Sequence, residues 1–76
     1  MKLRQMQAGQ AGSIESVKVQ GPLGMRLREM GLIPGAKLQV EGRAPLYDPV
    51  RIRLNGQSLT LRNREADYIE ISGDQA

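Results

Sequence analysis

Two short runs of alternating apolar residues, separated only by Asn55-Gly56, restrict the fold of this chain more than any other feature. Asn-Gly between such runs is the strongest short-range signal for a β-hairpin closed by a two-residue type I′ turn. A shift of one residue in the pairing of the two runs would place leucines opposite arginines and expose half of the apolar face. The turn chemistry and the hydrophobic pattern therefore predict the same hairpin, with these apolar pairs on one face: Val50 with Leu61, and Ile52 with Leu59.

A helix is predicted over Pro22–Met30, because Leu23, Leu27 and Met30 fall on one apolar stripe. Proline suits the first helical position, where its missing N–H would lack an intrahelical partner anyway. A glycine after Met30 can take positive φ and end the helix in a Schellman motif, and a Pro-Gly pair then matches a type II turn. Structural roles are expected for Leu27, Met30, Gly31, Leu32, Pro34 and Gly35.

Three further strands are predicted around these elements. Ala36, Leu38 and Val40 alternate with polar residues, and residues 68–71 form a last strand with two inward isoleucines, Ile69 and Ile71, after a short turn at 64–67. Residues 11–19 form a first strand whose irregular spacing indicates a bulge near Glu15-Ser16. The ends, 1–10 and 72–76, are expected to be the least ordered, which leaves an ordered core of roughly residues 11–71.

Five short strands and one helix predict a fold that is mainly β with one α-helix. The architecture that fits is a small SH3-like antiparallel β-barrel, because curling the sheet limits its exposed edges. A chain of 76 residues is long enough for one domain, residues 1–76.

The absence of cysteine and histidine removes most catalytic chemistry. There is no thiolate nucleophile, no side chain that titrates near neutrality, and no zinc site of the Cys/His kind. We therefore expect no enzymatic activity and no cofactor. No stretch approaches the roughly 20 apolar residues of a membrane span. The basic start is not followed by the apolar segment of a signal peptide, so a cytoplasmic protein without membrane insertion is expected.

Three segments, in order, resemble the ferrous iron transport protein A (FeoA) family. Residues 26–35, RLREMGLIPG, resemble its RL-x-x-MGL-x-PG core, and residues 44–49, APLYDP, are similar to its APLGDP loop. The segment from residue 59 to residue 69 is similar to its closing L-x-LR…EA…I pattern. Structural roles are therefore also expected for Pro45, Asp48 and Pro49. The chain departs at Tyr47, where the family commonly has Gly. If that Gly adopts positive φ, Tyr47 must be accommodated by a different loop conformation.

The resemblance implies an SH3-like barrel with a helical insertion, acting as a small cytoplasmic accessory or regulator of bacterial ferrous iron uptake. Its implied partner is the membrane transporter, ferrous iron transport protein B (FeoB), which has a cytoplasmic GTP-binding domain. Transition metal ion binding is associated with the family name, yet the acidic residues show no recognisable iron-site spacing. No metal site is assigned, and weak metal binding stays an alternative through Glu41, Asp48, Glu65, Asp67 and Glu70.

Two groups of residues are candidates for partner binding. Leu46 and Tyr47 form either a recognition loop or a loop that folds back over one barrel end. Arg51, Arg53 and Arg62 share the second face of the predicted hairpin. They form either a solvated basic stripe that protects the edge of the sheet or a docking site for an acidic surface of FeoB.

The alternative function is a small basic nucleic-acid-binding module. Only two tyrosines could stack on bases, and neither is interleaved with the stripe, so no nucleic acid is expected. A monomer is favoured. Asn55-Gly56 is expected to be a turn and nothing more.

Overall fold

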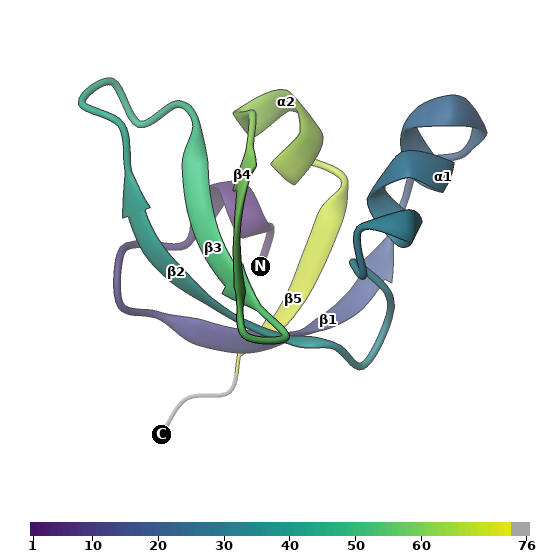
Figure 1. Cartoon of the computed structure of the whole chain (residues 1–76), viewed down its shortest axis with the longest axis horizontal. Helices are drawn as coiled ribbons and strands as arrows, with labels where there is room; N and C mark the ends of the chain where they lie inside the picture. Colours follow the sequence, from purple (N-terminus) through teal and green to yellow (C-terminus); the bar gives the residue numbers. More distant parts are fainter. Residues whose placement is uncertain (74–76) are drawn as a thin grey trace.

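The computed structural model describes residues 1–73 as one curled sheet with short helices at its borders. The five strands are antiparallel, in the order β4-β3-β2-β1-β5. In chain order they are β1 (Ala11–Val17), β2 (Lys37–Arg43), β3 (Val50–Leu54), β4 (Gln57–Leu61) and β5 (Ile69–Gly73). The helical elements are a 3₁₀ turn, η1 (Leu3–Gln5), and the helices α1 (Gly21–Glu29) and α2 (Asn63–Ala66). Figure 1 shows α1 standing beside the sheet and α2 joining its two edge strands.

The concave face of the sheet holds one apolar core to which every strand contributes. Burying a Leu, Ile, Val or Met side chain in this core stabilises the fold by about 1.5–3 kcal/mol relative to exposure. The fully or nearly fully buried residues are Leu3, Met6, Ile14, Leu27, Leu32, Leu38, Val40, Val50, Ile52, Leu54, Leu61, Ala66, Ile69 and Ile71.

The β3–β4 hairpin has the predicted register. Val50 pairs with Leu61 and Ile52 with Leu59. Asn55 and Gly56 both have positive φ, 53° and 79°, as a type I′ turn requires. The local sequence pattern was sufficient to predict this hairpin, because the turn and both strands lie within 12 consecutive residues, Val50 to Leu61.

The predicted helix is present, shifted by one residue: α1 runs from Gly21 to Glu29, and Met30 is its C-cap. The predicted Schellman ending is confirmed. Gly31 has φ +99°, and the N–H of Leu32 donates to the carbonyl of Leu27 at 3.1 Å, which is the Schellman hydrogen bond. The following Pro-Gly turn is closed by the Ala36 N–H donating to the Ile33 carbonyl at 3.0 Å. These two turns reverse the chain between α1 and β2.

The bulge predicted in β1 is also present. The register of β1 against β5 shifts between Ile14 and Ser16, which leaves Glu15 as the extra residue. A second shift, in β2 between Val40 and Gly42, was not predicted. Both bulges bend the strands and so help the sheet to curl.

The expectation of a weakly ordered N-terminus is wrong. Leu3 and Met6 are buried in the core, at 0% and 2% exposure. Met1 exchanges two backbone hydrogen bonds with Ile71, and Lys2 forms a β-bridge with Glu70. The N-terminal segment thus covers the outer edge of β5, and the ordered region begins well before residue 11. Of the C-terminal residues expected to be least ordered, 74–76 lie outside the described residues.

Residues 64–66 of the segment predicted as a short turn lie in the one-turn helix α2, and Asp67 is its C-cap. Its start is fixed by Glu65, whose Oε1 accepts the N–H of Arg62 at 2.9 Å. Glu65 is 7% exposed, and its other oxygen lies 3.3 Å from Nη2 of Arg26 in α1. This ion pair connects α1 to α2.

Candidate partner-binding surface

The loop of residues 44–49, between β2 and β3, carries the two most exposed large apolar side chains of the described region. Leu46 is 89% exposed and Tyr47 is 68% exposed. Figure 1 shows this loop projecting beyond the upper end of the sheet. The alternative in which these side chains fold back over the barrel is therefore wrong. Exposed apolar groups on a loop held by a sheet are typical of a binding surface.

Arg43 holds this loop to the rest of the molecule. Its Nη1 donates to the carbonyl of Tyr47 and to Oδ1 of Asn63, both at 3.1 Å. Its Nε and Nη2 donate to backbone carbonyls in the N-terminal segment, those of Leu3, Arg4 and Met6, at 2.6–3.2 Å. One guanidinium thus joins the loop, α2 and η1.

The sequence analysis missed Arg43. Its acceptors lie up to 40 positions away in the chain, so no local motif could have revealed the role. The side chain enters none of the ion pairs formed among residues 1–73. Its charge is balanced by backbone and amide oxygens, which makes these charge-assisted hydrogen bonds strong.

Tyr47 itself has positive φ, +63°. Tyrosine thus takes up the left-handed geometry that favours glycine, so a positive φ at this position does not by itself require a different loop conformation. Three hydrogen bonds hold it there: its N–H donates to the carbonyl of Ala44 at 2.7 Å, and its carbonyl accepts Nδ2 of Asn63 at 2.8 Å and Nη1 of Arg43 at 3.1 Å.

The other residues of the loop have structural roles. Asp48 Oδ1 accepts the N–H of Asn63 at 2.9 Å, and the bond between Asp48 and Pro49 is cis. The Ala44 N–H donates to the carbonyl of Pro49 at 3.1 Å and closes the loop at its base. Leu46 and Tyr47 are thereby presented from a firmly tied loop.

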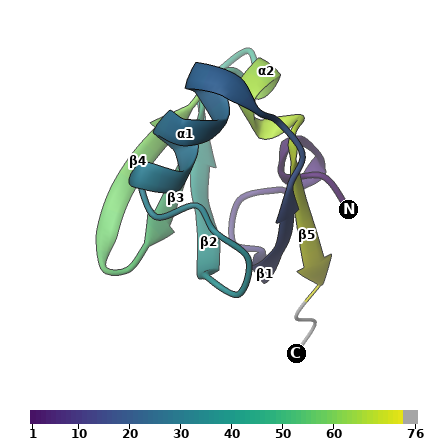
Figure 2. The ribbon, with the colours of Figure 1, turned by 90° about the vertical axis from the view of Figure 1, so that its right-hand side faces the viewer.

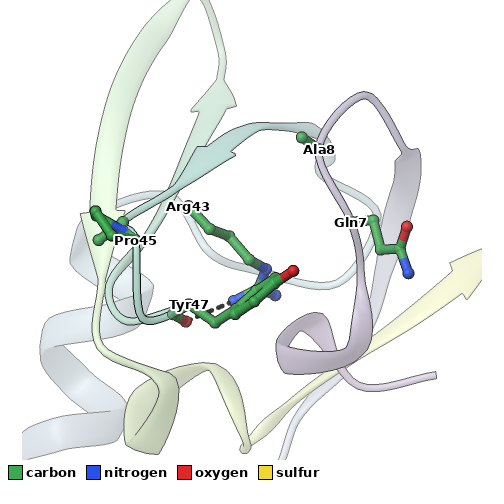
Figure 3. A pocket seen from close by; sticks show the side chains of 6 residues that line it. Gln7, Ala8, Arg43, Pro45 and Tyr47 are labelled. Atoms are coloured by element: carbon green, nitrogen blue, oxygen red, sulfur yellow. Dashed lines mark hydrogen bonds between the residues drawn. The ribbon is translucent and has the colours of Figure 1, made fainter.

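A hollow of about 440 Å³ lies between this loop and the segment after η1. Figure 3 shows the side chains of Arg43 and Tyr47 pointing toward one another in this hollow, with Pro45 on one side and Gln7 and Ala8 on the other. The hollow combines a cation with apolar and aromatic groups, so it can receive a side chain of a partner protein.

The predicted basic stripe is divided in the structure. Nε of Arg51 lies 3.4 Å and Nε of Arg53 lies 3.1 Å from the carboxylate of Glu41 on β2. The hydroxyl of Ser58 donates to the same carboxylate at 2.8 Å, and it lowers the pKa of Glu41, with further contributions from Arg53 and Arg51. Arg62 lies with Arg4 and Arg64 around a different hollow.

The acidic residues considered as metal ligands have separate partners. Asp67 pairs with Arg4 at 2.9 Å, and Glu70 lies 3.8 Å from the amino group of Met1. Within residues 1–73, no three acidic side chains gather closely enough to hold a metal ion. In the same part of the chain, no helix has the length and apolar character needed to cross a membrane.

A strongly curled five-stranded sheet, with a helix inserted between its first two strands, defines a small SH3-like barrel domain. This fold is shared with a crystal structure of Stenotrophomonas maltophilia FeoA, described as a procaryotic SH3 domain protein, at a TM-score of 0.83 and 22% identity. That match covers 95% of this chain and 89% of the other. The predicted fold class is therefore confirmed.

The chain belongs to the FeoA domain family, whose model matches residues 1–73. The solution NMR structure of FeoA from Chlorobium tepidum is 39% identical, with a TM-score of 0.91, over 99% of this chain and 71% of that chain. A fusion of Fe(2+) transport protein A with the Fe(2+) transporter FeoB, from Porphyromonas gingivalis (strain ATCC BAA-308 / W83), is 34% identical over 71 residues. These residues are 93% of this chain and 8% of the fusion protein, so the chain spans less than a tenth of that relative.

Proposed function

We propose that this chain is a non-enzymatic regulator of ferrous iron transport, which binds FeoB on the cytoplasmic side of the membrane. The observation that carries the proposal is the relative in which an FeoA domain and FeoB form one polypeptide. Fusion keeps two domains at a high effective concentration, which suits a pair that acts in contact. The regulatory effect is exerted by this contact, without chemistry on the chain itself.

Leu46 and Tyr47 supply the central contact in this proposal. They are 89% and 68% exposed, and the carbonyl of Tyr47 is anchored by Arg43 and Asn63. A tied loop loses little conformational entropy on binding, and tyrosine is enriched among residues that dominate interface energies.

Arg51 lines a hollow with Pro49, and Arg62 lines another with Asp48, so both lie beside the contact. Arg53 lies toward the other end of the hairpin, where it donates to the carbonyl of Gly56. The three arginines favour an acidic partner surface, chiefly through the rate of association.

The test is a titration of the chain with purified FeoB and with the cytoplasmic region of FeoB, followed residue by residue by NMR. We expect saturable shifts centred on residues 44–49. Tyr47→Ala is expected to weaken binding by about 2 kcal/mol, roughly thirtyfold in Kd, and Leu46→Ala by a smaller factor. Met25→Ala is the matched control, because Met25 is a large apolar side chain on α1 with 62% exposure.

Two results would contradict the proposal. One is the absence of binding to either form of FeoB at high concentration and low salt. The other is binding that Met25→Ala weakens as much as Leu46→Ala and Tyr47→Ala do, because the contact would then lie elsewhere. Circular dichroism of each variant checks that the fold is retained.

A further inference from the structure

A second surface, next to the 44–49 loop, gathers five cationic side chains. It lies where η1, α2 and β5 meet, which Figure 2 shows side by side near the N-terminus. Two adjoining hollows share Arg4 and Arg64 as lining residues. We call this the basic surface, and its cationic residues are Lys2, Arg4, Lys18, Arg62 and Arg64.

The carboxylates of this region are already engaged. Asp67 pairs with Arg4 at 2.9 Å, Asp48 accepts the N–H of Asn63 at 2.9 Å, and Glu70 lies 3.8 Å from the amino group of Met1. Four cationic side chains of the basic surface enter none of the ion pairs formed among residues 1–73: Lys2, Lys18, Arg62 and Arg64.

The arginines outside the basic surface are mostly committed to partners of their own. Arg26 pairs with Glu65, Arg51 and Arg53 share Glu41, and Arg43 donates to neutral oxygens. On the basic surface, by contrast, five cationic side chains lie together beside three carboxylates, and this excess of cations favours the approach of anions.

A tyrosine, Tyr68, borders the basic surface. Tyr68, 41% exposed, lines one of its two hollows. Tyrosine is favoured at the boundary between lipid and water, because its ring is apolar and its hydroxyl is polar.

We propose that the basic surface lies against the anionic headgroups of a lipid bilayer, with Tyr68 at the headgroup level. Cations that enter no ion pair, with a bordering tyrosine, fit such a surface, and each cation near it favours binding by about fivefold. The choice of a bilayer over an acidic protein rests on the proposed function, since FeoB is a membrane protein. Because the 44–49 loop adjoins the basic surface, the chain could contact FeoB and the surrounding headgroups together, and each weak contact would strengthen the other.

The test uses the full chain without FeoB and measures its cosedimentation with vesicles. One set contains equal parts of phosphatidylglycerol and phosphatidylcholine, and the other contains phosphatidylcholine alone. We expect binding to the anionic vesicles only, falling as salt screens the charges. The variant R62Q/R64Q is expected to lose about twenty-five-fold in partition, at fivefold for each cation. K2Q/K18Q is expected to lose a similar factor, and it serves if R62Q/R64Q does not fold.

The matched control is R51Q/R53Q, which removes the same charge from the pair of arginines bound to Glu41. It is expected to retain vesicle binding. The proposal is overturned by absence of binding to anionic vesicles at low salt, by equal losses in R51Q/R53Q and R62Q/R64Q, or by binding to a single-stranded oligonucleotide without binding to vesicles. Because FeoB is absent from this assay, these outcomes are independent of the FeoB titration.

Discussion

At the scale of single residues, Tyr47 combines an unfavourable backbone conformation with an exposed side chain. A non-glycine residue in the left-handed region costs of order 1 kcal/mol, and the hydrogen bonds from Arg43 and Asn63 to its carbonyl hold it there. Because Tyr47 lowers the stability of the fold at this position, its presence is better explained by a contact of its side chain with a partner than by a contribution to the fold.

Tyr47→Gly is therefore expected to stabilise the protein and to weaken binding of FeoB. We expect a gain of roughly 0.5–1 kcal/mol in the free energy of unfolding, measured with urea, because glycine removes the strain at φ +63°. Tyr47→Ala is the control, since it removes the same ring without relieving the backbone and should bring no such gain. A loss of stability in Tyr47→Gly would show that the ring packs in the fold.

Arg43 is the second residue whose role can be isolated. Arg43→Lys keeps the charge but cannot donate at once to the loop, to Asn63 and to the N-terminal carbonyls. We expect a loss of about 2 kcal/mol in urea unfolding, because partly buried acceptors lose charge-assisted hydrogen bonds. Arg51→Lys, at an exposed ion pair, should stay within about 0.5 kcal/mol. Equal losses in the two variants would contradict this role of Arg43.

At the scale of elements, the sequence predicted what short segments determine. The β3–β4 register, the ending of α1 at Gly31 and the bulge after Ile14 each follow from residues that are neighbours in the chain. The one-turn helix α2 has one local determinant, the Arg62 N–H that donates to Glu65, and one distant determinant. The Asp48 carboxylate that accepts the N–H of Asn63 lies 15 positions upstream of α2.

The candidate site shows the same division. The exposed Leu46-Tyr47 pair was visible as an apolar dipeptide in a proline-rich loop, and the structure places it as expected of a loop tip. The pairing of Arg51 and Arg53 with Glu41 was not visible, because it joins two strands whose register is fixed by burial of their other faces. Alternation indicates which face a side chain occupies, but not which neighbour neutralises it.

Glu41 links three adjacent strands, and its protonation should weaken that link. The hydroxyl of Ser58 on β4, then Arg53 and Arg51 on β3, hold the pKa of Glu41 below its ordinary value of about 4.5. A depressed pKa in the folded state means that the contribution to stability is present above pH 4.5 and is lost as the pH falls through the folded value. NMR titration of the carboxyl group should show this lowered midpoint.

Two variants test the cause of the lowered pKa. Ser58→Ala should move the midpoint of Glu41 upward, because it removes the largest favourable interaction of the carboxylate. Glu41→Gln should remove the part of the acid dependence of unfolding that belongs to this group. If the midpoint is unchanged in Ser58→Ala, the arginines alone determine the pKa of Glu41.

At the scale of the whole molecule, burial does not follow position in the chain. The N-terminal segment contributes to the core, whereas the 44–49 loop in the middle of the chain is exposed. Leu3 lies near a terminus, yet it is fully buried. Its carbonyl and those of Arg4 and Met6, which lie in η1 and directly after it, accept hydrogen bonds from Arg43. Leu46 lies in the middle of the chain and is 89% exposed. Long-range contacts, absent from any local pattern, decide which leucine belongs to the core.

The same substitution at these two leucines should therefore separate stability from binding. Leu3→Ala is expected to cost about 3 kcal/mol in urea unfolding, because it opens a cavity in the core and loosens the segment that covers the edge of β5. Leu46→Ala should change the free energy of unfolding by less than about 0.5 kcal/mol while weakening binding of FeoB. If Leu46→Ala destabilises the protein as Leu3→Ala does, the loop is part of the scaffold and its exposed side chains are no evidence of a binding surface. If Leu3→Ala is neutral, the N-terminal segment does not hold the base from which the loop projects.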